Sequence, residues 1–271
     1  MNAPLAAETS PIRLEPRDGG LLRITLVDAA RRNALSLRMI AALADAVAAA
    51  SADPAVRVVI LAAEGPAFSA GHDLKELTAA RANPDRGRAV FEETMTRCAA
   101  LMTSIVRSPK PVIAEVAGVA TAAGCQLVAS CDLAVAAEAA VFATPGVHIG
   151  LFCSTPMVAL SRNVAPKHAM EMLLTGASVP AADAARMGLV NKVVPADRLT
   201  EATEAMARLI ASKSPLTLKI GKEAFYAQRE MTLDEAYALT ARVMVENMLA
   251  RDAEEGISAF IEKRHPVWEG R

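Results

Sequence analysis

The chain has 271 residues and a formal net charge of −1, so no global field draws it to nucleic acid or to an anionic membrane surface. Hydrophobic residues make up 53% of it, enough for a full core, but aromatic residues only 3%, so that core must be aliphatic. No apolar run reaches the roughly 20 residues that span a bilayer. We therefore expect neither a nucleic-acid nor a membrane partner.

The N-terminus has no basic n-region and no long apolar run, so we expect residues 1–10 to be a disordered lead-in rather than a signal or transit peptide. Four cysteines, Cys98, Cys125, Cys131 and Cys153, lie in apolar contexts without metal-binding spacing. Reduced structural thiols are typical of the cytosol. This composition predicts a cytoplasmic protein that binds no metal.

In chain order, the segments IRLEP and LLRITLVD predict two strands joined by a Gly-containing turn. Ser36 then opens an Ala-rich amphipathic helix that stops near Asp53. Residues 56–63 predict a buried strand, and PAFSAGHDLKEL a loop that leads into a short helix at about Asp73. A long helix follows, with apolar residues at helical spacing from Phe91 to Ile105.

Beyond that helix, VIAEV predicts a strand, GVATAAGCQL a loop and helix, DLAVAAE a strand, and AVFATPGVHIGLF a strand and loop. From Thr155 onward the chain reads as almost entirely helical. Strands that alternate with helices imply a parallel sheet with right-handed crossovers. We divide the chain into the lead-in 1–10, an α/β core at 11–195 and a C-terminal helical region at 196–271, within one continuous domain.

Two strand-to-helix joints, FSAGHDL and GVATAAGCQL, place small residues where a helix begins. Unpaired backbone amides collect at a helix N-terminus, and the helix dipole there favours negative charge. Two such amides that converge on one point would form an oxyanion hole. The alternative is that both joints are tight turns whose small residues serve packing alone.

Five separated segments carry a family resemblance: AFSAGHDLKEL, KPVIAEVAGVATAAGCQLVASCDLAVA, FATPGVHIG, LLTGASVPAADAARMGLVNKVVP and GISAFIEKRHP. Spanning about residues 12–266 in order, they resemble the enoyl-CoA hydratase/isomerase, or crotonase, superfamily. The resemblance implies an α/β fold with a ββα spiral core and a C-terminal helical trimerisation region. It also implies homotrimers or hexamers, and a coenzyme A thioester as substrate or ligand with no permanently bound cofactor.

The resemblance places the thioester oxygen on the backbone amides of His72 and Ala123, where the family usually has Gly at the second position. The CoA adenine would lie against the loop that holds three further residues, namely Ala70, Asp73 and Leu74.

The CoA phosphates would meet Arg31 or Arg32, and Phe260 with Lys263 matches a pair on the C-terminal helix that often reaches a neighbouring subunit's CoA. Ordinary solvated surface charge is the alternative for Arg31, Arg32 and Lys263.

True hydratases of the family use two glutamates, and this chain has Gln126 and Gly146 at those positions. Gln126 orients a water by hydrogen bonds but takes no proton near neutral pH, and Gly146 is an empty position. His72 and His148 are candidates for a substitute base, against the alternative that each is only a packed or surface histidine.

The sequence supports three readings of function. The chain acts on an acyl-CoA thioester through an oxyanion hole but not by ordinary hydration, for instance by decarboxylation or thioester hydrolysis. Alternatively it is a non-catalytic acyl-CoA-binding or regulatory protein, or an enoyl-CoA hydratase of fatty-acid metabolism with a substitute base.

Overall fold

The computed structural model describes residues 10–271, so the predicted lead-in, with the expectation of no targeting peptide, lies outside the described residues except for Ser10. A six-stranded sheet forms the centre of the fold, and its strands follow the order β1-β2-β3-β5-β7-β10. All neighbours pair in parallel except β1 and β2, which form the predicted hairpin. The strands are Ile12–Arg17, Leu21–Leu26, Val58–Ala63, Val112–Val116, Leu133–Ala137 and Lys192–Val194.

A second sheet of four short strands, in the order β4-β6-β8-β9, lies beside the first. They are Ala67–Ser69, Val119–Thr121, Val141–Ala143 and Val179–Pro180. Each of the first three strands directly follows a strand of the main sheet in the chain: β4 follows β3, β6 follows β5 and β8 follows β7. The chain therefore adds one strand to each sheet in each of these three repeats.

The sequence interpretation was wrong at four places in this second layer and the sheet edge. Strands β4 and β6 occupy segments that we expected to be loop, and β9 and β10 interrupt the stretch after Thr155 that we expected to be helical. These strands have two or three residues each, too few to display the alternation from which a strand is predicted.

Most helices of the core pack on one face of the main sheet, around a continuous aliphatic core. They are α1 (Leu37–Ala52), α2 (Leu74–Ala80), α3 (Arg88–Arg107), α4 (Ala123–Ser130), α5 (Pro156–Leu160), α6 (Pro166–Thr175) and α7 (Ala181–Met187). Three short 3₁₀ segments lie in connections between elements: η1 (Ala29–Arg31), η2 (Pro145–Ile149) and η3 (Ala196–Arg198). Helix α8 (Leu199–Ala211) covers the other face, where Leu199 and Ala207 pack on β3, β5 and β7.

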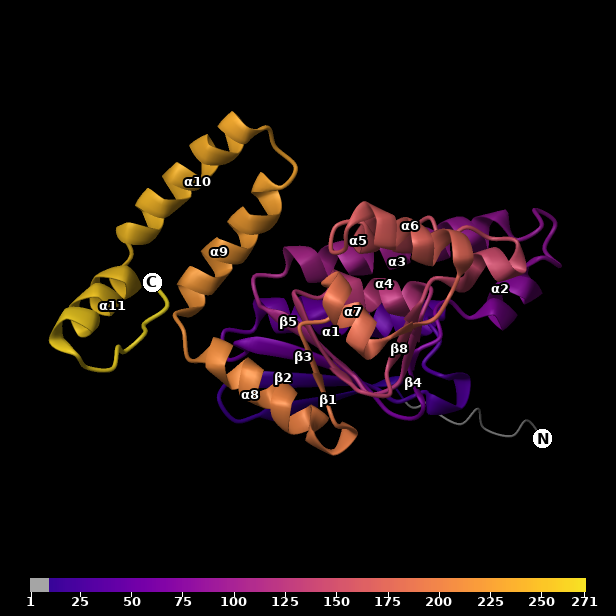
Figure 1. The fold of residues 1–271 in the computed structure, drawn as a ribbon, viewed down its shortest axis with the longest axis horizontal. Helices are drawn as coiled ribbons and strands as arrows, with labels where there is room; N and C mark the ends of the chain where they lie inside the picture. The colour runs from indigo at the N-terminus through magenta and orange to yellow at the C-terminus, as the bar shows by residue number, and fades with distance from the viewer. Residues whose placement is uncertain (1–9) are drawn as a thin grey trace, which may run out of the picture.

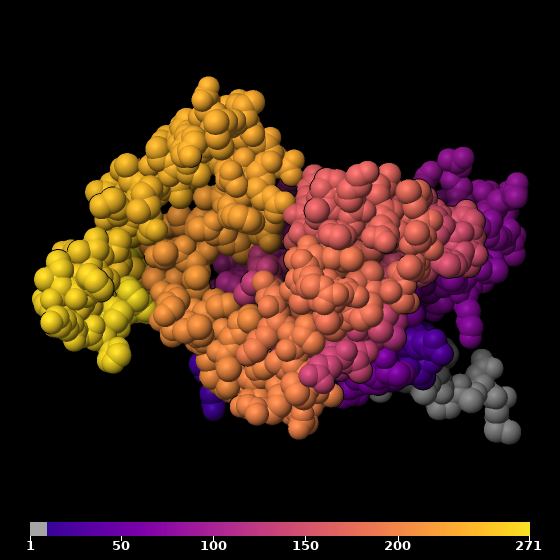
Figure 2. Space-filling model, viewed as in Figure 1, coloured from indigo at the N-terminus to yellow at the C-terminus, as the bar shows by residue number. Residues whose placement is uncertain are grey.

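Three further helices extend from the core as an arm (Figure 1), and Figure 2 shows a hollow between this arm and the core. They are α9 (Pro215–Gln228), α10 (Leu233–Met248) and α11 (Arg251–Glu262). Helix α9 is tied to the core by Lys222, whose Nζ donates to the Asp132 carboxylate at 2.7 Å and to the carbonyls of Ile105 and Lys110. Between residues 10 and 271, no helix combines the length and apolarity needed to cross a membrane.

Candidate functional site

The loop after β4 and the loop after β6 touch one another. Thr121 Oγ1 donates to the Ala70 carbonyl at 3.2 Å. A Cβ added to Gly71 would lie 2.9 Å from the Ala122 Cβ and 3.2 Å from the Ala123 nitrogen. Only a residue without a side chain allows this approach, and Gly71 also has a φ of +87°. The two predicted joints therefore form one site.

The segment before α1 holds the first loop in place. The Leu35 amide donates to the Gly71 carbonyl at 2.8 Å, and the Ala70 amide donates to the Arg32 carbonyl at 3.0 Å. Buried Asn33 donates through Nδ2 to the carbonyl of Ala67 at 2.8 Å. These bonds fix the backbone around His72 without using its amide.

The amides of His72 and Ala123 have no protein acceptor among residues 10–271. Ala123 is the first residue of α4, so its amide lies at the positive end of the helix dipole. Ala122 turns the chain into α4 with a φ of 51° and a ψ of −120°, an unusual conformation for a residue with a side chain. Two free donors on adjoining loops are what an oxyanion hole needs.

Close packing holds α4 against the second sheet. A Cβ on Gly124 would lie 2.2 Å from the Ser69 carbonyl oxygen, so any larger residue would push the helix away from β4. The Ala122 amide donates to the Ala143 carbonyl of β8 at 2.9 Å. The small residues of this stretch therefore allow close packing of α4 on β4 and leave the Ala123 amide without a protein partner among the described residues.

Three buried polar atoms around these loops have no hydrogen-bond partner in the described part of the chain: Gln126 Oε1, His72 Nε2 and Thr144 Oγ1. Gln126 lies on α4, one turn beyond Ala123, and is buried. Burial lowers the pKa of His72, so its imidazole is neutral near pH 7. Buried polar groups are normally paired, which makes these atoms available to a ligand or to water.

Gly146 leaves no room for a side chain. A Cβ there would lie 2.7 Å from the Leu151 carbonyl oxygen and 2.9 Å from the Cys153 Sγ. Burial raises the pKa of Cys153, although the Gly146 amide donates to its sulfur and acts in the opposite direction. Burial also raises the pKa of Cys125, to about 12. Both thiols are therefore protonated near neutral pH, which fits core packing and not a nucleophile.

His148 has its own partner outside the loop pair. Its Nε2 lies 3.0 Å from the Thr175 carbonyl at the end of α6. Because a carbonyl only accepts, Nε2 must donate here, which leaves Nδ1 as the ring nitrogen that can accept a proton. Glu115 is likewise engaged elsewhere: it pairs with Arg23 through both carboxylate oxygens and accepts from Thr200.

Most of the residues predicted to bind CoA lie beside the oxyanion loops. Arg31 and Arg32 are exposed at the end of η1, next to Ala70 through the bond described above. The Asp73 carboxylate caps α2 by accepting from two backbone amides, and Leu74 is 51% exposed.

Phe260 lies elsewhere, on α11 at the far end of the arm (Figure 1), and Lys263 is the residue that caps the end of this helix. Within one chain they do not join the site, so their predicted role requires a neighbouring subunit.

Sequence reasoning missed Thr121 and Thr144. Both lie at the ends of short strands that we expected to be loop or ordinary strand, Thr121 closing β6 and Thr144 following β8. A hydroxyl residue directly before Pro145 was the signal that could have identified Thr144, since the end of a strand beside a helix N-terminus is a common place for ligand contacts.

Known proteins resemble this chain over nearly its whole length. A protein named "Enoyl-CoA hydratase domain-containing protein 3, mitochondrial" from Xenopus laevis is 48% identical over 268 residues, 99% of this chain and 90% of that protein. A solved structure of enoyl-CoA hydratase from Mycobacterium smegmatis has a TM-score of 0.91 and 49% identity, covering 95% of this chain and 98% of the other.

The structure of human enoyl Coenzyme A hydratase domain-containing protein 3 has a TM-score of 0.90 and 47% identity, covering 95% of this chain and 100% of the other. These likenesses confirm the predicted crotonase fold with its C-terminal helices. They contradict the predicted cytoplasmic location, because the relatives from Xenopus laevis, Rattus norvegicus and Homo sapiens are named mitochondrial.

The thiols that suggested the cytosol are uninformative here, since all four are buried and packed. The model of one family, described as enoyl-CoA hydratase/isomerase, matches residues 17–271. With that match and relatives close to half identical, the chain belongs to the enoyl-CoA hydratase/isomerase family.

Proposed function

We propose that this protein binds an acyl-CoA thioester and polarises its carbonyl with the backbone amides of His72 and Ala123, without ordinary hydratase chemistry. The observation that carries the proposal is the junction of the two loops, where neither amide has an acceptor within the part of the chain that the structure describes. Preorganised donors of this kind stabilise an oxyanion or enolate, and the loss of one typically costs about 2.7–4 kcal/mol.

The neighbouring side chains support chemistry other than hydration. Gln126 takes no proton, and the space beside Gly146 is filled by the Leu151 carbonyl and the Cys153 thiol. Loss of a positioned acid or base typically lowers a rate by about 10²–10⁴-fold per group. Decarboxylation needs only stabilisation of the enolate and suits these neutral groups. Thioester hydrolysis needs in addition a water that Gln126 would orient by hydrogen bonds, with the proton of that water passing to the leaving thiolate.

A non-catalytic acyl-CoA-binding role is the second candidate. It is favoured by the lack of a carboxylate at either glutamate position. The side chains beside the two amides include Gln126 and a neutral His72. The third reading, a hydratase with a substitute base, is less favoured because His148 Nε2 donates to the Thr175 carbonyl, which leaves only Nδ1 of that ring as a proton acceptor.

CoA would lie along Ala70, Asp73 and Leu74 with its phosphates near Arg31 or Arg32. Phe260 and Lys263 would complete this site from a neighbouring subunit of a homotrimer or hexamer, which their position at the end of the arm supports.

The experiment is a comparison of binding and turnover. Calorimetry with CoA and a saturated acyl-CoA should show binding, while crotonyl-CoA hydration should be at least about 10⁴-fold slower than in a hydratase with both glutamates. A panel of acyl-CoAs, including carboxylated ones, then separates the enzyme from the binding protein. Hydration within tenfold of an ordinary hydratase would contradict the proposal, as would a failure to bind any acyl-CoA.

A further inference from the structure

A cavity of about 320 Å³ lies where α9 meets the core. It lies at the opposite end of strands β3 and β5 from the oxyanion loops. Its walls come from the end of α1, the entries to β3 and β5, and the first turn of α9. The amino ends of β3 and β5 open into it, whereas His72 and Ala123 follow their carboxyl ends. The cavity is therefore separate from the site described above.

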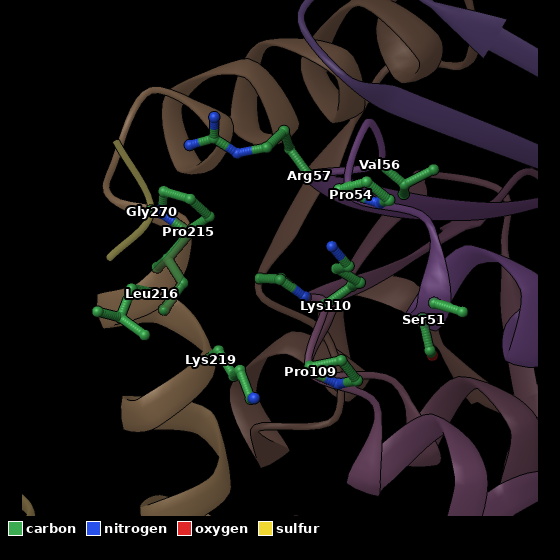
Figure 3. A pocket seen from close by; sticks show the side chains of 13 residues that line it. Ser51, Pro54, Val56, Arg57, Pro109, Lys110, Pro215, Leu216, Lys219 and Gly270 are labelled. Atoms are coloured by element: carbon green, nitrogen blue, oxygen red, sulfur yellow. The ribbon is translucent and has the colours of Figure 1, made fainter. Parts of the chain in front are cut away.

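Three cations from three elements surround this cavity (Figure 3): Arg57 before β3, Lys110 before β5 and Lys219 on α9. No acidic residue lines it. In the described part of the chain no carboxylate lies within 4.0 Å of these three side chains. Like charges gathered in this way repel one another unless an anion joins them.

Burial and the neighbouring cations both act on the pKa of Lys110. Burial lowers the pKa of Lys110 first, and the charges of Arg57 and Lys219 lower it further. Asp53, just outside the cavity, acts in the opposite direction but does not reverse the shift. An anion bound among these side chains would offset the repulsion between their charges.

Arg57 is held firmly in the wall. Its Nη2 donates to the Lys213 carbonyl at 2.5 Å, and its stem packs on Gly20, where a Cβ would lie 2.4 Å from the Arg57 Cγ. Its Nε is buried without a partner among the described residues. A fixed guanidinium with an unused donor is suited to an anion with several oxygens.

Helix α9 adds a further attraction for negative charge. This helix of 14 residues begins at Pro215, in the cavity wall, so the positive end of its dipole lies there. The C-terminus of α1, which carries the negative end of that helix dipole, also lies in the cavity wall. The competing explanation is that Lys110 and Lys219 balance this negative end and bind no ligand.

We propose that this cavity is a binding site for a small phosphorylated molecule, whose phosphate oxygens would be shared by Arg57, Lys110 and Lys219. A phosphate offers more oxygens than a carboxylate, which suits three separate cations. The rest of the wall is largely apolar, with Val56, Pro109, Pro111 and Leu218. A cavity of this size fits a small organic phosphate better than a free ion alone.

Calorimetric titration of the full-length protein with inorganic phosphate and with phenyl phosphate, at constant ionic strength, tests the proposal. Both probes should bind, and tighter binding of phenyl phosphate would identify an organic phosphate as the natural class, whereas equal binding would identify free phosphate. Lys219→Gln and Lys110→Gln should each weaken binding by about tenfold, because each removes a charge-assisted contact.

Lys167→Gln, on exposed α6, removes the same charge far from the cavity and is the matched control. Its affinity for both probes should equal that of the wild type, and saturating CoA should not displace them. Three results would each overturn the proposal: no binding by the wild type, equal weakening in Lys219→Gln and the control, or displacement of phosphate by CoA.

Discussion

Among single residues, Ala122 adopts the unusual backbone conformation that precedes the buried, unpaired amide of Ala123. Its φ of 51° is a conformation that costs about 1–3 kcal/mol for a residue with a side chain. Glycine avoids that cost but makes the unfolded chain more flexible, which returns about 0.4–1 kcal/mol. Ala122→Gly should therefore raise the free energy of unfolding by about 1 kcal/mol, measured by urea denaturation.

The adjacent Ala123→Gly is the matched control, because Ala123 is helical and gains nothing from glycine. It should lower the free energy of unfolding by about 0.5–1 kcal/mol. Equal effects of the two substitutions would show that Ala122 carries no backbone cost.

His72 should make the protein less stable in mild acid. Its pKa is lowered in the folded state by burial, so below about pH 6.5 the unfolded chain binds a proton that the folded chain resists. This contribution to stability is complete above pH 6.5 and is lost as the pH falls toward the lowered folded pKa. We expect the loss of stability between pH 7 and pH 5 to be smaller in His72→Gln than in the wild type.

Parallel curves of unfolding free energy against pH for the two proteins would contradict this account of His72. The substitution keeps the backbone amide, so binding of acyl-CoA at pH 7 serves as the check that the site is intact.

Gly146 shows what a sequence cannot supply at this scale. The sequence shows directly that the second glutamate is absent. It does not show that Leu151 and Cys153 fill the space where that side chain would lie. The same holds for His148, which lies two residues beyond Gly146 and yet bonds to α6. Both depend on contacts between segments, whereas the unpaired amide of Ala123, the first residue of α4, follows from a local rule at helix N-termini.

At the scale of elements, the anchoring of α9 depends on a buried ion pair. Lys222 and Asp132 are both mostly buried, and Tyr226 donates to the second oxygen of Asp132 at 2.9 Å. Breaking a buried pair leaves an uncompensated charge and costs about 3–5 kcal/mol. Lys222→Met should lower the free energy of unfolding by about that amount in urea denaturation.

Tyr226→Phe removes one hydrogen bond to the same carboxylate and keeps the ring, so it should cost only about 1.5–3 kcal/mol. A Lys222→Met variant as stable as the wild type would mean that apolar packing alone holds α9 on the core.

The long elements could be predicted from the sequence because their signals are local. Ser36 caps α1, Asp73 caps α2, and the apolar spacing of α3 is unbroken. Strands β4, β6, β9 and β10 could not, since they exist only through pairing with neighbours distant in the chain. Most of the second sheet, which positions the oxyanion loops, was therefore missed from the sequence, although its strand β8 was expected.

At the scale of the whole molecule, the arm of α9, α10 and α11 leaves many large apolar side chains exposed. Nine of them lie on α10, α11 and the residues between: Leu233, Tyr237, Met244, Val245, Met248, Leu249, Ile257, Phe260 and Ile261. Exposed apolar area of this extent is typical of an interface. We expect light scattering to give three or six times the 28.4 kDa mass of one chain.

A mass of one chain at micromolar concentration would contradict that expectation. It would also leave Phe260 and Lys263 with no route to a CoA site, because α11 lies at the other end of the molecule from β4 and α2, which flank the loop of Ala70 (Figure 1).

The proposed role of the His72 and Ala123 amides is to hold a thioester oxygen. Infrared spectroscopy tests this role through the carbonyl stretch of a bound, saturated acyl-CoA that is labelled with ¹³C at C1. Two hydrogen bonds to the oxygen weaken the C=O bond, so the account predicts a band at lower frequency in the complex than in free acyl-CoA. If all the acyl-CoA is bound and its carbonyl band stays at the solution frequency, the two amides do not hold the thioester oxygen.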